Sequence, residues 1–162
     1  MENRCKSSLY RLVLLCSVLA GCQTSITPPS LPSGINSNSP DAFPTYSADG
    51  NYLAFASDRR GHRNVFLYDL RSKQLVGLPK LNHRNSSQDN PVLSADGRYV
   101  VYVSTERGKK DIFLYDRQTQ KRELLSANIK GSADNPTING DGTKVAFQAS
   151  QLGQWKIVLV ER

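Results

Sequence analysis

The chain after residue 40 alternates short apolar runs with polar, turn-rich segments and shows no 3.6-residue periodicity. In the first such stretch this pattern predicts four strands, at residues 45–47, 52–57, 65–69 and 74–78. The Asp49-Gly50 pair predicts a tight hairpin turn between the first two strands. The second and third strands are apolar almost without alternation, so both faces of each small sheet should be covered.

The same stretch occurs three times. The block that begins Pro44-Thr-Tyr-Ser-Ala-Asp-Gly begins again 47 residues later at Pro91 and 45 residues after that at Pro136. Four-stranded units that repeat about every 45 residues are typical of β-propeller blades. The sequence therefore predicts an all-β domain over residues 40–162, a partial propeller whose antiparallel blades lie at about 40–79, 88–125 and 133–162. Leucine-rich and helical solenoids are excluded.

The N-terminal residues are typical of an export signal. A basic segment precedes nine uncharged residues, Leu12 to Ala20, which are too few to span a bilayer as a helix of about 20 residues. The following Leu19-Ala20-Gly21-Cys22 resembles the lipobox of bacterial lipoproteins. That resemblance implies that residues 1–21 are a lipoprotein signal peptide and that Cys22 is lipidated. An ordinary secretory signal cut near Ala20, with an unmodified Cys22, is the alternative.

Residues 22–39 are rich in Ser, Thr, Pro and Asn, which predicts a flexible linker between the membrane and the propeller. Gln23 stands where lipoproteins retained at the inner membrane carry Asp. By this resemblance we expect the protein to be exported and anchored in the cell envelope, at the periplasmic face of the outer membrane.

The composition offers little chemistry. The 162 residues allow one modest domain. Three cysteines and two histidines are too few for a disulfide scaffold or a typical zinc site, so we expect no metal and no cofactor. No nucleophile elbow or phosphate-binding loop occurs, and His62 and His83 lie in polar loops, so we expect no enzyme. Nucleic acid is not an expected partner of an exported protein, despite the net charge of +7.

Two blocks of the repeat resemble a known family. The Pro-x-x-Ser-x-Asp-Gly block, followed by (Val/Ile)-Phe-Leu-Tyr-Asp, is similar to the WD-like propeller repeat of the TolB family. The resemblance covers about residues 40–162 and implies a periplasmic protein that binds another envelope component. The same blades occur in the propeller domains of some peptidases. From this sequence we expect no counterpart of the separate N-terminal α/β domain of TolB.

Three blades are fewer than the 4 to 8 of closed propellers. The third repeat also reaches Arg162 just after its third strand. We expect two chains to form a homodimer that closes a six-bladed ring. A monomeric crescent whose ends are shielded by the linker, or a truncated product, is the alternative.

Two groups of residues are candidate sites. Asp89, Asn90, Asp134 and Asn135 should precede the innermost strands and point into the central funnel, where they could receive a peptide or a cation; capping of the turn before proline is the alternative. The loops between second and third strands collect basic residues that could bind an acidic protein or an anionic polymer; a solvated surface is the alternative. These are Arg59, Arg60, Arg63, Arg107, Lys109 and Lys110.

Taken together, these features favour a membrane-anchored, exported propeller scaffold that binds another envelope protein or an anionic envelope polymer without catalysis. An accessory or remnant of a propeller-containing hydrolase is one alternative. A sensor of a small ligand or cation is the other.

Overall fold

The computed structural model describes residues 34–162, and that part of the chain is built from strands without any helix. Accordingly, the described residues contain no helix of the length and apolarity that a membrane crossing requires. The predicted signal peptide, Cys22 and most of the predicted linker lie outside the described residues. The strands are β1 (Asp41–Tyr46), β2 (Tyr52–Ser57), β3 (Asn64–Asp69), β4 (Gln74–Val76), β5 (Gln88–Leu93), β6 (Tyr99–Ser104), β7 (Asp111–Asp116), β8 (Lys121–Leu124), β9 (Ala133–Ile138), β10 (Lys144–Gln151) and β11 (Gln154–Glu161).

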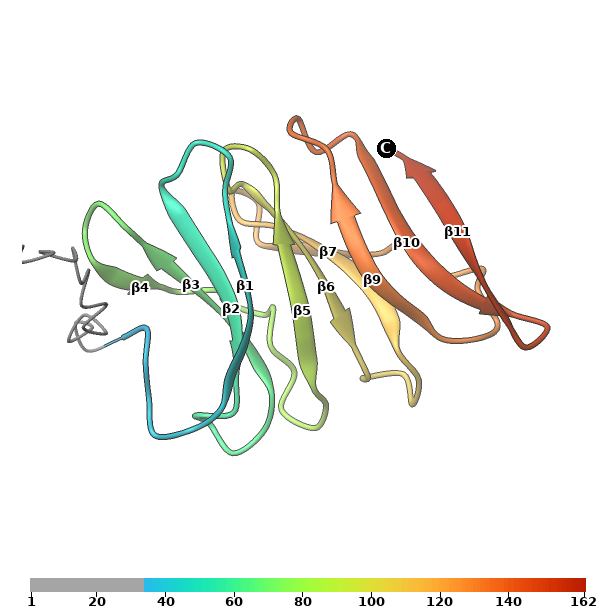
Figure 1. The fold of residues 1–162 in the computed structure, drawn as a ribbon, viewed down its shortest axis with the longest axis horizontal. Coiled ribbons are helices and arrows are strands. Elements are labelled where there is room, and N and C mark those ends of the chain that lie inside the picture. Colours follow the sequence, from blue (N-terminus) through green and yellow to red (C-terminus); the bar gives the residue numbers. More distant parts are fainter. Residues whose placement is uncertain (1–33) are drawn as a thin grey trace, which may run out of the picture.

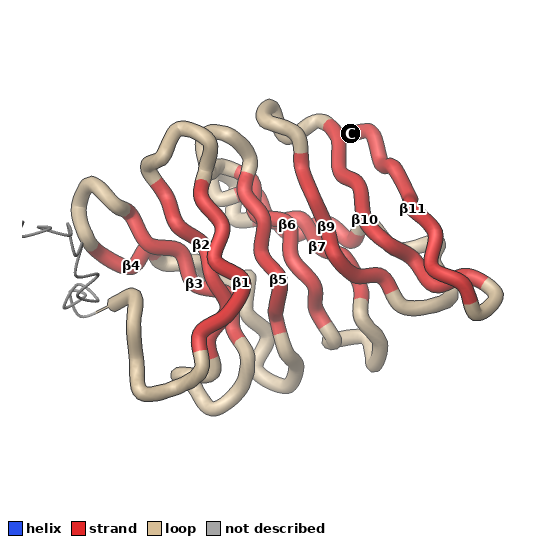
Figure 2. The backbone as a smooth tube through the Cα atoms, viewed as in Figure 1, coloured by secondary structure: helices blue, strands red, loops and turns tan. Residues whose placement is uncertain are grey.

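These strands form three antiparallel sheets, which confirms the predicted partial propeller. Blade 1 has the order β1-β2-β3-β4, blade 2 the order β5-β6-β7-β8, and blade 3 the order β9-β10-β11. The sheets stand in chain order with the inner strands β1, β5 and β9 side by side (Figure 1). The tube view shows the same row of sheets, joined by loops at both ends of the strands (Figure 2).

The predicted strand bounds hold best in the middle of each sheet. In blade 1 the second strand has the predicted limits and the third begins one residue early, while the fourth ends two residues early, at Val76. The inner strand is longer than predicted, because β1 begins at Asp41 and runs through Pro44. Proline suits this position because β1 is an edge strand, whose outward N–H groups need no ladder partner.

This extension corrects the placement of the four predicted funnel residues. Asp89 and Asn90 lie within β5, and Asp134 and Asn135 lie within β9. They therefore belong to the inner strands themselves and do not precede them. The prediction was wrong because it took proline as the start of the strand.

The Asp-Gly segments are turns, as predicted, and the first is one residue longer than the predicted strand limits of 47 and 52 imply. Five residues, Ser47 to Asn51, separate β1 from β2, and Gly50 N–H donates to the Ser47 carbonyl at 2.9 Å. The Ser47 hydroxyl and the Asn51 N–H donate to the Asp49 carboxylate, which lowers the pKa of Asp49 below its usual value. Asp96 accepts the equivalent bonds from the Ser94 hydroxyl and the Arg98 N–H, whereas Asp141 accepts from the hydroxyl and the N–H of Thr143. The pKa values of both aspartates are lowered as well. The aspartates therefore fix the turns.

The core lies between the blades. We call the face of a blade toward the next blade in the chain its leading face, and the opposite face its trailing face. Between blades 1 and 2 the buried cluster is Ala54, Val65, Leu67, Leu81, Leu93, Val100, Tyr102, Phe113 and Tyr115. Between blades 2 and 3 it is Val101, Val103, Ile112, Leu114, Ala133, Val145, Phe147 and Ala149. Each junction thus buries the apolar faces that two neighbouring sheets turn toward each other, as the unbroken apolar strands predicted. The leading face of blade 3, which the same pattern predicted to be covered, is not covered within residues 34–162.

A tyrosine clamp repeats at both junctions. Tyr52 of blade 1 lies against the turn glycine Gly97 of blade 2, and Tyr99 of blade 2 lies against Gly142 of blade 3. An arginine of the following blade covers each ring: the guanidinium carbon of Arg117 lies 4.2 Å from the centroid of Tyr52. In the second clamp, Arg162 lies 4.8 Å from the Tyr99 centroid. The absence of a side chain at these glycines lets the blades approach closely.

The two ends of the row differ. The trailing face of blade 1 buries Leu53, Phe55, Phe66 and Tyr68, with Ile35 packed against them. Gly34 and Ile35, predicted as part of a flexible linker, thus lie against this face. At the other end, Ile157 and Leu159 of β11 are 69% and 76% exposed. One end of the row is covered within the described chain and the other is open.

Candidate functional site

Each inner strand carries a bulge at the same position. In β5, Asp89 pairs with Val103 and Val92 pairs with Val101, so β5 takes three steps where β6 takes two. β1 and β9 show the same shift of register. The extra residue bends the strand and turns its side chain out of the ladder.

The bulged residue has a left-handed backbone in all three blades. Its φ is 52° at Phe43, 47° at Asn90 and 50° at Asn135. Asparagine tolerates this conformation, whereas for other residues with a Cβ it costs about 1–2 kcal/mol of conformational free energy. Phe43 is therefore a strained residue where the other repeats carry Asn, and its side chain is 48% exposed.

Side-chain amides run from blade 2 to blade 3 along this row. Asn90 Nδ2 donates to Asn135 Oδ1 at 3.1 Å, and Asn135 Nδ2 donates to Gln148 Oε1 at 3.0 Å. The chain of amides leaves donor and acceptor capacity at its exposed atoms. It can therefore recognise groups that both donate and accept hydrogen bonds.

The two funnel aspartates are paired with cations of the preceding blade. Lys110 Nζ lies 2.6 Å from Asp134 Oδ2. Its repeat equivalent Arg63 lies 3.8 Å from Asp89 Oδ1 and binds Asp58 at 2.8 Å. The carboxylates are thus compensated inside the protein, which reduces what they could offer to a bound cation. Among residues 34–162, no three His, Cys, Asp or Glu side chains gather as a metal site would require.

The four predicted funnel residues line one cavity of about 330 Å³. Its lining is Phe43, Ser87, Asp89, Asn90, Val103, Thr105, Lys110, Asp134 and Asn135. All three blades contribute to this cavity or its edge, because Phe43 comes from β1, Asn90 from β5 and Asn135 from β9. Sequence reasoning missed Phe43 and Gln148; the signal at Phe43 was its departure from the Asn of the other repeats.

The predicted basic residues do not form one free patch. Arg59 donates to the carbonyls of Gly34 and Ile35 and lies 3.0 Å from Asp41. Its guanidinium carbon is 4.8 Å from the centroid of the Phe66 ring. Arg59 is therefore a latch that holds the N-terminal segment on blade 1.

Two further basic residues surround one buried carboxylate. Lys109 binds Asp111, and Arg107 lies 3.6 Å from the same side chain. Asp111 also accepts from the Ser126 hydroxyl at 2.6 Å. With Arg63 and Lys110 paired across the blades, five of the six predicted residues have a carboxylate partner within the chain.

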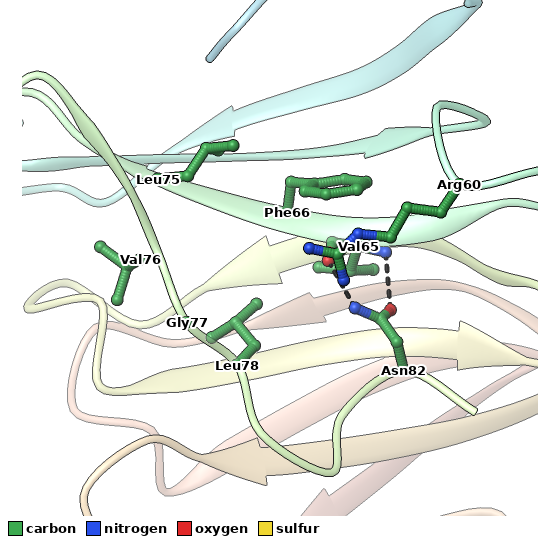
Figure 3. Close-up of a pocket in the computed structure, with 8 residues that line it drawn as sticks. All are labelled: Arg60, Val65, Phe66, Leu75, Val76, Gly77, Leu78 and Asn82. Atoms are coloured by element: carbon green, nitrogen blue, oxygen red, sulfur yellow. Dashed lines mark hydrogen bonds between the residues drawn. The ribbon is translucent and has the colours of Figure 1, made fainter. Parts of the chain in front are cut away.

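Arg60 is the sixth, and no ion pair involves it within residues 34–162. Its guanidinium carbon lies 5.1 Å from the Phe66 centroid, beside a cavity of about 170 Å³ next to β3 and β4 (Figure 3). There the Asn82 side chain accepts from the Val65 N–H and donates to the Val65 carbonyl, both at 2.9 Å. It thus takes the place of a strand partner for the backbone of β3 beyond the end of β4.

A neighbouring cavity of about 510 Å³ gathers the histidines of the polar loops. It is lined by Arg60, His62, Asn64, Asn82, His83 and Arg84. The sequence placed the two histidines in separate loops, and only the fold brings them to one surface.

Comparison with known proteins identifies the repeat. A family model described as the TolB beta propeller domain matches residues 33–162. TolB from Acinetobacter baumannii is 21% identical with a TM-score of 0.58, over 74% of this chain and 29% of that one. A putative TolB from Agrobacterium tumefaciens is 19% identical with a TM-score of 0.65, over 78% of this chain and 47% of that one.

A puromycin-hydrolyzing peptidase of Mycobacterium tuberculosis is also similar, with 17% identity and a TM-score of 0.58 over 76% of this chain and 19% of that one. This chain spans less than half the length of each of these structures. The three likenesses concern the fold. No curated protein matches the chain.

Proposed function

The chain belongs to the TolB beta propeller domain family, and on this premise we propose that it is a non-catalytic binding module of the bacterial envelope. Its ligand is an extended segment of another protein, held in the funnel cavity. A lipid on Cys22 anchors the module at the periplasmic face of the outer membrane, as its lipobox and Gln23 indicate.

Phe43 is the observation that carries this proposal. A strained backbone persists where the surrounding structure enforces it, and such residues cluster at binding sites. Two repeats relieve the strain with Asn, whereas the first repeat keeps a half-exposed aromatic ring at the edge of the cavity. An exposed ring beside a cavity offers apolar contact area to a ligand.

The polar lining favours a peptide over the other ligands. Backbone amides of an extended peptide donate and accept, which matches the row from Asn90 through Asn135 to Gln148. A cation would meet carboxylates that Lys110 and Arg63 already compensate. An anionic polymer would need free cations, and five of the six predicted ones are engaged within the chain.

The cavity lining also supports a role without catalysis. Ser87 and Thr105 are its only hydroxyl residues, and no histidine lines it. A nucleophilic hydroxyl needs an adjacent base, most often histidine, to be activated. Binding is therefore the chemistry that these residues favour.

Site-specific photo-crosslinking in cells tests the proposal. The full chain carries a benzophenone amino acid at Phe43, or, as a control, at Leu75 of β4, whose exposure of 40% is similar. We expect position 43 to give a discrete protein adduct that maps to one linear segment of the partner, and position 75 to give none. Asn135→Asp keeps the left-handed backbone but removes the Nδ2 donor, and should reduce the adduct severalfold.

Equal adducts at both positions, or none at position 43, would overturn the peptide-binding proposal. An adduct suppressed by anionic polymer and unaffected by Asn135→Asp would favour the polymer instead. Turnover of a hydrolase substrate that depends on Ser87 or Thr105 would contradict the absence of catalysis.

A further inference from the structure

The open end of the row repeats a face that is buried elsewhere. The leading face of blade 1 presents Ala54, Val65 and Leu67, and that of blade 2 presents Val101, Ile112 and Leu114. The same repeat positions in blade 3 are Ala146, Ile157 and Leu159. Strand register is therefore retained in blade 3, and residue type is retained at these three positions, although Ile157 and Leu159 are exposed. The fourth leading-face position, Val103 in blade 2, is Gln148 in blade 3. Such a face is built to be covered.

The internal junctions show what covers it. The leading face of blade 1 packs on the trailing face of blade 2, which presents Val100, Tyr102, Phe113 and Tyr115. The trailing face of blade 1 carries the same kinds of residue at the same positions, Leu53, Phe55, Phe66 and Tyr68. By this template the open face of blade 3 fits the trailing face of a blade 1.

The charges at the junctions point to the same pair of faces. Both internal junctions join a cation to a carboxylate, Arg63 to Asp89 and Lys110 to Asp134. At the equivalent positions the open end of blade 3 has Trp155, 53% exposed, and blade 1 has Ala42. The cation and the carboxylate are both absent, so a junction between these two faces leaves no unpaired charge at these two positions.

The trailing face of blade 1 already has a cover within the chain. Ile35 packs against it, and the Arg59 latch holds the carbonyls of Gly34 and Ile35. This N-terminal strap, residues 34–40, is a short segment with few buried groups. A blade that docks on this face must displace the strap.

We propose that blade 3 of one chain docks on the trailing face of blade 1 of a second copy, and that residues 34–40 compete for that face. Docking in both directions brings six sheets into a ring, a number within the 4 to 8 of closed propellers. The ring places the partner's Phe43 next to the Gln148 end of the amide row, so the second copy contributes to the funnel. The tyrosine clamp does not recur, because Lys144 and Leu70 stand where the internal junctions have tyrosine and arginine. The junction is therefore weaker than the internal ones, and the dimer dissociates on dilution.

Light scattering on the purified full chain in detergent measures the protein mass. We expect a dimer at high concentration that dissociates on dilution. Ile157→Asp should raise the dimer dissociation constant at least about tenfold, because it buries an unpaired carboxylate. Leu152→Asp, on an exposed leucine at the tip of the same hairpin, is the control and should change nothing. Ile35→Asp should have the opposite effect and increase the dimer fraction, since it weakens the strap.

Cysteine pairing separates the ring from other dimers. A short thiol cross-linker should join two chains that carry both Trp155→Cys and Ala42→Cys, and should fail with either substitution alone. A cross-link with Trp155→Cys alone would show blade 3 against blade 3 and overturn the proposed ring.

A mass that stays monomeric at all concentrations, for the parent chain and for Ile35→Asp, would overturn any dimer through this face. An unchanged dimer fraction in Ile35→Asp would overturn the competition by the strap. These outcomes do not depend on a peptide in the funnel, so they are separate from the cross-linking test of function.

Discussion

Alanine at the three turn glycines should measure how closely the blades pack. Gly50, Gly97 and Gly142 occupy the same place in the repeat, with φ of 70°, 68° and 78°. A Cβ at Gly50 would meet no atom within 4 Å. At Gly97 it would lie 2.6 Å from Tyr52 Cδ2, and at Gly142 it would lie 2.3 Å from Tyr99 Cδ2.

The three substitutions share one cost and differ in another. A left-handed alanine costs about 1–2 kcal/mol, and this alone applies to Gly50→Ala. The other two must also displace a tyrosine ring that an arginine covers, and overpacking of this kind costs about 1–3 kcal/mol. We therefore expect Gly97→Ala and Gly142→Ala to lower the free energy of unfolding by about 2–5 kcal/mol.

Urea unfolding followed by far-ultraviolet circular dichroism gives these free energies for the full chain in mild detergent. Gly50→Ala is the internal control, because it has the same backbone strain without a neighbour. Three equal losses would refute the close packing of the blades, since only the backbone term would then remain. Truncation of Tyr99 to Ala in the Gly142→Ala background should remove most of the extra cost.

Three further predictions concern the anchor, the acid limit and the funnel. Cys22→Ser should abolish the incorporation of labelled palmitate and release the protein from the membrane fraction, as measured by fractionation. Arg98 holds the pKa of Asp116 at about 2, below the unfolded value of about 3.9. The ion pair therefore stabilises the fold above about pH 4, and this stabilisation is lost as the pH falls toward 2. Between these pH values the urea midpoint of Asp116→Asn should fall less than that of the parent. Phe43→Asn should raise the free energy of unfolding by about 1 kcal/mol, because it relieves the left-handed strain; a loss of stability in urea unfolding would contradict the strain.

The sequence predicted the blades well because their signal is local and repeated. The run from Tyr52 to Ala56 is apolar and is followed by Ser57 and a polar turn, so the predicted bounds of this strand match the structure. The inner strands were harder, because the bulge places a proline inside each edge strand. Local propensity treats proline as a boundary, and only pairing with the next strand shows that the ladder continues beyond it.

The candidate site was predicted in part for a similar reason. Asp89-Asn90 and Asp134-Asn135 each precede a proline at the same repeat position, so the periodicity predicted that they lie together, and in the structure they line one cavity. The partners of the charged residues could not be predicted from the sequence, because the packing of the blades determines which carboxylate lies next to which guanidinium. Arg59 therefore looked like a member of a binding surface, whereas in the structure it holds residues 34 and 35 on blade 1.

Departures from the repeat carry the information that the repeat itself cannot. At a position that packs between two blades, the neighbouring blade restricts which residue type fits. The leading faces of blades 1 and 2 accordingly carry Ala, β-branched and Leu residues at the same positions. Phe43 departs where the strand faces the funnel, and Trp155 and Ala42 depart where the row has no neighbour within the described chain. If these three departures were neutral sequence variation, substitution of the three residues would change neither the fold nor what the molecule binds. If they face a ligand and a second copy, their substitution should leave the fold of each blade intact and change what the molecule binds.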